Sequence, residues 1–210
     1  MSQETETILK MITLGSSDVG KTSILNRYFN SDFTPNLLTS IGIDFKTKIF
    51  KFDGQKVKFN FVDTAGQEKF RAISSNYLKG TDGILFVFDI ANIETFELIQ
   101  VWIEEINENN RENVGIMLFG NKLDLEKERQ VSIEDAEKLS KELGCKYFEG
   151  SAKTGENIQE ALDELAKISF EKYKTLKRVD KGKSIKLTHG QNSMNDNDKS
   201  QKDLKKKKFC

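Results

Sequence analysis

The octapeptide GSSDVGKT, from Gly15 to Thr22, constrains the fold of this chain more than any other segment. It fits the pattern G-x-x-x-x-G-K-[ST], in which glycines let the backbone curl so that successive N–H groups face one phosphate. The apolar segment 8–14 before it predicts a buried strand, and the helical spacing of apolar residues in 23–29 predicts a helix. A plain glycine-rich turn is the alternative, but a strand and a helix in these places favour a phosphate-binding loop.

The last two residues of this loop are the ones expected to face the ligand with their side chains. Lys21 would reach the outer phosphates, and the Thr22 hydroxyl would ligate Mg²⁺. In and directly after this loop, the other residues expected to contact the nucleotide are Ser17, Asp18, Val19, Gly20 and Ser23. A carboxylate near a triphosphate is repelled, so we expect the side chain of Asp18 to point outward.

Length and charge divide the chain into residues 1–176, called the body, and a basic tail that begins at Lys177. The 210 residues suffice for one domain with a substantial core and a remainder. From Lys177 to Cys210 there are 11 basic and 4 acidic residues, a net charge of +7, whereas the body is acidic. An acidic body disfavours nucleic acid, and a basic tail suits an anionic membrane surface. We expect an extension over 1–7, a domain over 8–174 and a disordered tail over 175–210, with large apolar residues nearly absent after Lys177.

Alternation of apolar runs and amphipathic stretches predicts an α/β domain with a mostly parallel sheet and one antiparallel edge strand. Continuous apolar runs at 83–89 and 114–120 are typical of parallel strands covered on both faces. The expected antiparallel pair joins 44–52 to 57–62 through a tight turn at Asp53-Gly54. The other expected elements are a helix over 94–109, a helix capped by Ser132, a short strand at 146–148 and a helix over 157–173.

Two segments after predicted strands indicate that the base is guanine. The Asp124 carboxylate, in Asn121-Lys122-Leu123-Asp124, can accept hydrogen bonds from the N1 and N2 hydrogens of guanine, a donor pair that adenine lacks. Lys122 can pack its stem over the base, and Asn121 can tie the segment to the phosphate loop. The backbone of Ser151-Ala152-Lys153 can meet the guanine carbonyl. Together these segments favour GTP over ATP.

A third segment, Asp63-Thr64-Ala65-Gly66-Gln67, follows the strand that ends at residue 62. Asp63 can hold Mg²⁺, and the Gly66 N–H can meet the γ-phosphate. Gln67 is the candidate for orienting the attacking water. The sequence therefore predicts a site for hydrolysis as well as for binding.

These segments resemble the nucleotide-binding motifs of the Ras superfamily, and the chain most resembles its Rab branch. Segments 41–45, 63–71 and 86–90 carry the Rab resemblance, which covers about residues 8–173. The resemblance implies the P-loop GTPase fold: a six-stranded, mostly parallel sheet with one antiparallel edge strand, flanked by about five helices. It further implies that Phe33 lies edge-on against guanine and that Ser40 ligates Mg²⁺. The implied effector-binding residues are Ile41, Gly42, Ile43, Asp44 and Phe45.

The resemblance also implies a monomeric GTP–GDP switch on the cytoplasmic face of intracellular or plasma membranes, cycling with the cytosol. The implied partners are an exchange factor, a GTPase-activating protein, a GDI-like escort carrier and effectors. Segment 33–45 contains no arginine, so turnover of the protein alone should be slow and accelerated by a partner's arginine. Ser40 replaces the threonine usual in the family and lacks its β-methyl group. We therefore expect the first switch segment, about 32–44, to adopt an open conformation more often in the GTP form.

The chain ends in Lys205-Lys206-Lys207-Lys208-Phe209-Cys210, which does not match the C-a-a-X prenylation pattern. We expect one prenyl chain on Cys210, assisted by the lysines, because a single lipid binds membranes only marginally without a second signal. An unmodified thiol is the alternative. For the whole chain, a nucleotide-binding scaffold with little turnover is a second interpretation, and an ATP-dependent kinase is a remote third.

Overall fold

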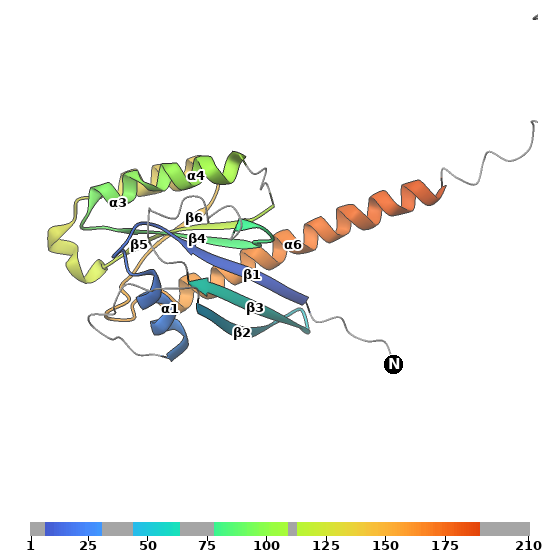
Figure 1. The fold of residues 1–210 in the computed structure, drawn as a ribbon, viewed down its shortest axis with the longest axis horizontal. Coiled ribbons are helices and arrows are strands. Elements are labelled where there is room, and N and C mark those ends of the chain that lie inside the picture. Colours follow the sequence, from blue (N-terminus) through green and yellow to red (C-terminus); the bar gives the residue numbers. More distant parts are fainter. Residues whose placement is uncertain (1–6, 31–43, 64–77, 109–112, 190–210) are drawn as a thin grey trace, which may run out of the picture. The chain divides into compact units, whose positions relative to one another are not determined.

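The computed structural model describes residues 7–30, 44–63, 78–108 and 113–189. A six-stranded sheet in the order β2-β3-β1-β4-β5-β6 forms its centre (Figure 1). The strands are β1 (Thr7–Leu14), β2 (Asp44–Phe52), β3 (Gln55–Asp63), β4 (Gly83–Asp89), β5 (Gly115–Asn121) and β6 (Lys146–Glu149). The helices in the described ranges are α1 (Lys21–Asn30), α3 (Ile93–Glu97), α4 (Ile99–Glu108), α5 (Ile133–Glu142), α6 (Ile158–His189) and the 3-10 helix η2 (Leu123–Glu128).

The sheet confirms the predicted α/β fold with one antiparallel edge. β2 runs antiparallel to β3, whereas the β1–β3, β1–β4, β4–β5 and β5–β6 pairs are parallel. Asp53 (φ 49°) and Gly54 (φ 80°) both have left-handed backbone conformations, which fits the two-residue turn expected between β2 and β3. The carboxyl ends of the parallel strands meet at one edge of the sheet, where α/β folds place ligands.

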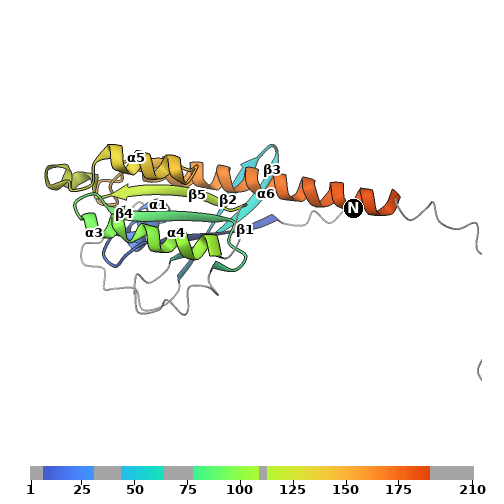
Figure 2. The ribbon, with the colours of Figure 1, turned by 90° about the horizontal axis from the view of Figure 1, so that it is seen from above.

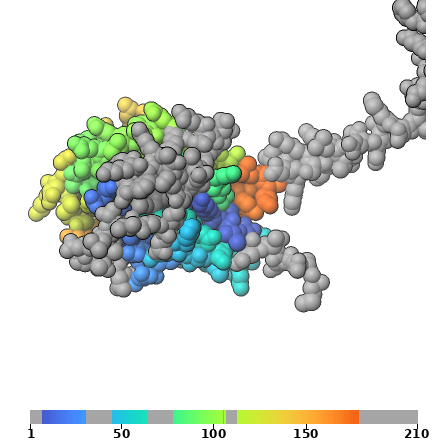
Figure 3. All heavy atoms as spheres, viewed as in Figure 1, coloured from blue at the N-terminus to red at the C-terminus, as the bar shows by residue number. Residues whose placement is uncertain are grey.

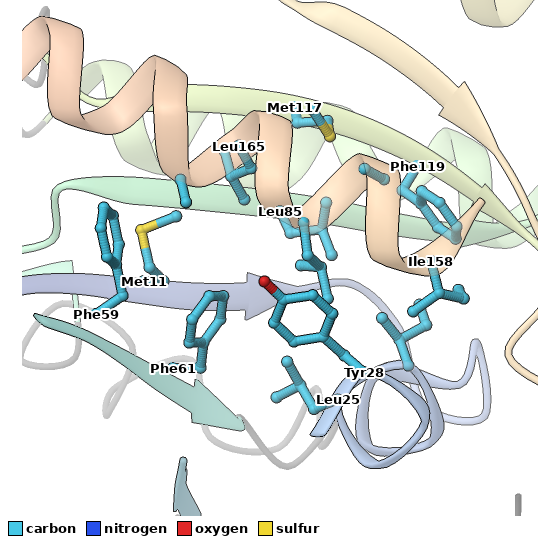
Figure 4. Close-up of a cluster of buried hydrophobic side chains, with 14 of the residues drawn as sticks. Met11, Leu25, Tyr28, Phe59, Phe61, Leu85, Met117, Phe119, Ile158 and Leu165 are labelled. Atoms are coloured by element: carbon cyan, nitrogen blue, oxygen red, sulfur yellow. The ribbon is translucent and has the colours of Figure 1, made fainter. Parts of the chain in front are cut away.

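Each face of the sheet has its own apolar core. Side chains from α1 and α6 pack on one face with residues of the central strands, as Figure 4 shows for Tyr28, Leu85 and Leu165. The other face packs against α4 and α5 through residues such as Ile103 and Leu139. Figure 2 shows α3 and α4 next to β4, and α5 beside β5. Every residue of β4 is buried because both of its faces are covered.

The predicted helix over 94–109 is interrupted in the structure. α3 ends at Glu97 and α4 begins at Ile99, with Leu98 between them. Leu98 keeps right-handed helical angles (φ −67°, ψ −14°), and its carbonyl accepts a hydrogen bond from the Val101 N–H three residues on, so the chain passes through a tighter turn. Among the apolar residues of this region, Ile99, Ile103 and Ile106 are buried, while Phe96 and Trp102 are partly buried.

The last helix is longer than predicted. α6 continues to His189, beyond the end expected near residue 173 and into the segment for which we expect a disordered tail. A helix already nucleated by packed residues extends readily through lysine, leucine and arginine, which have high helix propensity. The chain divides into two compact units, Met1–Lys174 and Thr175–Cys210. None of the helices in the described ranges is both long and apolar enough to cross a bilayer.

Close packing of α6 on the sheet depends on two glycines. A Cβ added at Gly83 would lie 2.3 Å from Ser169 Oγ, and one at Gly115 would lie 2.4 Å from the same atom. At Gly115 it would also lie 2.9 Å from the Ser169 Cα, which belongs to the helix backbone. Ser169 is fully buried, and its hydroxyl donates to the Leu165 carbonyl of α6. The helix can approach β4 and β5 this closely because neither strand has a side chain there.

We expect Gly115→Ala to lower the free energy of unfolding by about 2 kcal/mol, because its methyl group meets helix backbone that cannot rotate away. Adding Ser169→Ala should not restore stability, since the contact with the Ser169 Cα remains. Urea unfolding of the nucleotide-saturated protein measures the free energy of unfolding of the single and the double variant. Lys138→Ala, on the exposed face of α5, is the control. Full recovery in the double variant would contradict the packing argument.

Candidate functional site

The loop between β1 and α1 needs its two outer glycines. Gly15 has φ +151°, and a Cβ there would lie 2.1 Å from the Val87 carbonyl oxygen of β4. Gly20 has φ +96°, and a Cβ there would lie 2.4 Å from Asn121 Nδ2. Both the backbone conformation and the space therefore require glycine. The loop is thereby seated directly on the carboxyl ends of β4 and β5.

Lys21 lies inside the curl of this loop. Its side chain is 5% exposed, and its Nζ donates to the carbonyl oxygens of Gly15 at 2.8 Å and Ser16 at 2.6 Å. A buried ammonium group needs such acceptors, because an uncompensated charge in the interior is costly. The contacts place a positive charge at the centre of the loop, where an anionic group is best stabilised.

Thr22 and Asp63 are brought together from α1 and the end of β3. The Thr22 Oγ1 donates to Asp63 Oδ2 at 2.6 Å, and Asp63 is 3% exposed. Hydroxyl and carboxylate oxygens are the ligands that Mg²⁺ prefers, so this pair fits the expected metal. Within the described ranges no group of three or more His, Cys, Asp or Glu side chains could hold a metal ion.

The other loop residues differ in burial. Val19 is fully buried, Ser17 and Ser23 are partly buried, and Asp18 is exposed. The exposure of Asp18 agrees with the outward placement expected for its carboxylate. Asp18 also has a left-handed backbone (φ 60°), a conformation that aspartate tolerates better than most residues with side chains.

Asn121 connects three segments of the predicted site. It is 2% exposed at the end of β5. Its Nδ2 donates to the Val19 carbonyl in the phosphate loop at 2.7 Å, and its Oδ1 accepts from the Ala152 N–H at 3.0 Å. The amide therefore satisfies two backbone groups separated widely in sequence, as the expected tie to the phosphate loop requires.

Asp124 is held as an ionised carboxylate. Its Oδ1 accepts from Ser151 Oγ at 2.6 Å, and its Oδ2 lies 3.2 Å from Lys153 Nζ. Burial raises the pKa of Asp124, but the hydrogen bond from Ser151 and the contact with Lys153 lower it more, so the net pKa is below the ordinary value. The carboxylate is charged at neutral pH and remains an acceptor, as reading the N1 and N2 hydrogens of guanine requires.

Lys122 and Asp89 form a pair that the sequence analysis did not include in the site. Lys122 has a left-handed backbone (φ 68°), and its Nζ lies 2.7 Å from Asp89 Oδ2. Asp89 is 7% exposed, and its other oxygen accepts from the Ala91 N–H. In the sequence, Asp89 lies in segment 86–90, which carries part of the Rab resemblance, and it is the acidic residue that ends an apolar strand.

The segment after β6 is braced by several side chains. Ser151 is fully buried, and its Oγ accepts from the Thr154 N–H at 3.1 Å besides donating to Asp124. Arg129 pairs with Glu149, at the end of β6, through an N–O distance of 2.7 Å. Arg27 of α1 donates to the carbonyls of Ala152 and Lys153, the two residues after Ser151. Neither arginine was singled out from the sequence, because no motif includes them.

Several predicted residues lie outside the described ranges. These are Phe33, Ser40, Ile41, Gly42, Ile43, Gly66, Gln67 and Cys210. Of the expected effector segment, Asp44 begins β2 and Phe45 follows it with 64% of its surface exposed. The structure thus brings together the phosphate loop, Asp63 and both guanine-binding segments.

We expect Asn121→Ala to lower the free energy of unfolding by about 3 kcal/mol, because it leaves a carbonyl and an N–H buried without their partner. Thermal and urea unfolding measure the loss. The exposed Gln159→Ala serves as the control and should stay within about 0.5 kcal/mol of the unchanged protein. A similarly small effect for Asn121→Ala would mean that the amide does not hold these segments together.

Comparisons with known proteins agree with this geometry. The Ras family model matches residues 10–171. The GTP-binding protein ypt2 of Schizosaccharomyces pombe is 42% identical over 76% of this chain and 80% of its own length. The Ras-related protein SEC4 of Saccharomyces cerevisiae is 41% identical over 84% of this chain and 82% of its own.

The human Ras-related protein Rab-8B is likewise 41% identical, over 80% of this chain and 81% of its own length. The family match covers most of the chain, and each of these relatives is more than 40% identical over at least three quarters of it. The chain therefore belongs to the Ras family and is a Rab-like small GTPase, one of the GTP-hydrolysing switches of vesicle trafficking.

Proposed function

We propose that this Rab-like GTPase reads guanine through Asn121, Lys122 and Asp124 together with the segment Ser151-Ala152-Lys153. The observation that carries the proposal is the double hydrogen bond of Asn121, to the phosphate loop and to Ala152. These hydrogen bonds support the proposal because they join the loop proposed to bind phosphate to the segment proposed to bind the base. The ionised Asp124 then accepts from the two adjacent donors of guanine, which adenine cannot supply.

The triphosphate is bound by residues 17–23 in this proposal, with the Gly66 N–H at the γ-phosphate and Phe33 against the base. Ras-family GTPases use Mg²⁺ with GTP, and here Thr22, Asp63 and Ser40 would hold the ion, which neutralises charge on the phosphate oxygens. Lys21 already points its ammonium group into the curl of the loop. Gln67 orients the attacking water by the polar groups of its side-chain amide.

The switch consists of the two segments that depend on the γ-phosphate, about 32–44 and 63–77. When the phosphate leaves, their contacts to it are lost and the surface offered to partners changes. Effectors bind at 41–45 in this proposal, next to an apolar surface on the sheet edge. Phe45 (64% exposed) and Ile49 (60%) reach the solvent on the edge strand β2, and Ile8 of β1 is 50% exposed. Figure 3 shows β2 and β3, in cyan, at the surface of the molecule.

Residues 8–174 form the GTPase domain and 175–210 the membrane tether in this proposal. The basic tail and a prenyl group on Cys210 would hold the protein at the cytoplasmic face of a membrane. An escort carrier would cover the lipid in the cytosol, and an exchange factor and an activating protein would set the nucleotide state. The basic tail and the prenyl group must act together, because the lysines alone and one lipid alone each bind an anionic bilayer only weakly.

Hydrolysis tests the proposed activity. In single-turnover assays the protein alone should cleave GTP at about 10⁻⁴ s⁻¹, because no arginine stabilises the transition state from within the first switch. A Rab-directed activating protein should accelerate the reaction strongly, and Gln67→Leu should abolish the acceleration. Glu134→Ala, exposed on α5, is the control. Rates near 1 s⁻¹ without a partner would contradict the proposal, and tight binding without any accelerated turnover would favour a scaffold.

Lipidation can be tested directly. Mass spectrometry of the protein isolated from its native cells should show one prenyl group on Cys210. Cys210→Ser should then shift the protein from the membrane fraction to the soluble fraction, because the lysines alone bind weakly. An unmodified thiol on membrane-bound protein would contradict this part of the proposal.

A further inference from the structure

An arginine on α1 holds the segment that follows β6. Arg27 Nε donates to the Ala152 carbonyl at 2.9 Å, and Arg27 Nη2 donates to the carbonyl of Lys153. The guanidinium group presents several N–H donors in a rigid plane, so it can satisfy two successive carbonyls at once. Lysine carries a single charged nitrogen and could not reproduce this paired geometry. The contact joins residues more than a hundred positions apart in the chain.

The stem of Arg27 also packs against this segment. A Cβ added at Gly155 would lie 3.5 Å from Arg27 Cδ and 3.7 Å from its Nε, so the arginine passes along the turn after Lys153. Gly155 itself has φ +90°, which turns the chain back toward the start of α6. Arg27 therefore contacts the loop through its methylene groups and through its guanidinium group, and it is partly buried there.

Together with Asn121, this arginine holds both polar groups of Ala152. The Ala152 N–H donates to Asn121 Oδ1, and the Ala152 carbonyl accepts from Arg27. That carbonyl and the Lys153 N–H belong to one planar peptide unit, so fixing the direction of one fixes the other. Arg27 thus determines where a backbone N–H of the guanine-binding segment points.

We propose that Arg27 is a positioning residue for guanine, which slows nucleotide release by orienting the Lys153 N–H toward the base carbonyl. The inference rests on the proposed role of that segment in base recognition. α1 begins at Lys21 in the phosphate loop, so Arg27 also ties the base-binding segment to the helix that begins at the phosphates. The nucleotide is thereby retained at both ends by one rigid element.

The first experiment measures release of GDP from the full-length protein with Mg²⁺ present. The probe is GDP with a fluorescent group on the ribose, displaced by excess unlabelled GDP. We expect Arg27→Ala to release it about tenfold faster, which corresponds to about 1.4 kcal/mol. Arg27→Lys keeps the charge on a single donor nitrogen, and its release rate should lie between those of Arg27→Ala and the unchanged protein. Lys141→Ala, whose side chain is 76% exposed on α5, should release GDP like the unchanged protein.

The second experiment separates base positioning from general loosening. The probe is the diphosphate of 2-aminopurine riboside, which is fluorescent, keeps the 2-amino group and has neither the carbonyl nor the N1 hydrogen of guanine, so each variant is compared with the unchanged protein on this same nucleotide. Arg27→Ala should accelerate release of this nucleotide by less than twofold, because the Lys153 N–H finds no carbonyl acceptor on this base. Asp124→Asn provides the reference for loss of the other base contact and should accelerate GDP release strongly.

The outcomes distinguish the inference from the function on which it rests. Faster GDP release by Arg27→Ala, with the carbonyl-free nucleotide little affected, supports the inference. Equal acceleration of both nucleotides overturns it, since a merely loosened fold would release both. Unchanged GDP release in Arg27→Ala, with Asp124→Asn strongly affected, overturns the inference alone. Unchanged release in both variants overturns the guanine-site assignment and the inference with it.

Discussion

The nucleotide site depends on one buried amide, the side chain of Asn121. Its two hydrogen bonds reach the phosphate loop at Val19 and, at Ala152, the segment that we propose binds guanine. Each satisfies a backbone group that would otherwise be buried unpaired, so both segments are stabilised only when they are in place together. The close approach of Gly20 to the same amide shows how little space the arrangement leaves. The loop and the segment after β6 are consequently parts of one packed structure.

α1 connects this site to the rest of the domain. At its start Lys21 lies in the phosphate loop, and near its end the Tyr28 hydroxyl donates to Asp163 on α6. Burial, followed by the hydrogen bond and charge of Asp163, raises the pKa of Tyr28, so the phenol stays protonated and remains a donor. Lys48 of the edge strand lies 4.0 Å from the centroid of the Tyr28 ring and pairs with Asp163. α1, the edge strand β2 and α6 are therefore held together by one cluster of side chains.

Local patterns predicted much of this arrangement. The strands, the turn at Asp53-Gly54 and the Ser132 cap, whose Oγ accepts from the Asp135 N–H, follow from periodicity and turn chemistry and are confirmed. The extension of α6 past Lys177 was not predicted, because low apolar content argued for disorder while helix propensity argued for continuation. The interruption at Leu98 was missed since its residue type is compatible with an unbroken helix.

By itself, the sequence determined the order of elements, the phosphate loop and the residues suited to guanine, because these depend on backbone freedom and side-chain chemistry at fixed spacings. Only the tertiary structure decided which distant groups meet. No spacing relates Arg27 to Ala152, Lys122 to Asp89, or Gly115 to Ser169. Such pairs form because packing of helices on both faces of the sheet brings them within contact distance, and that packing is a property of the whole chain.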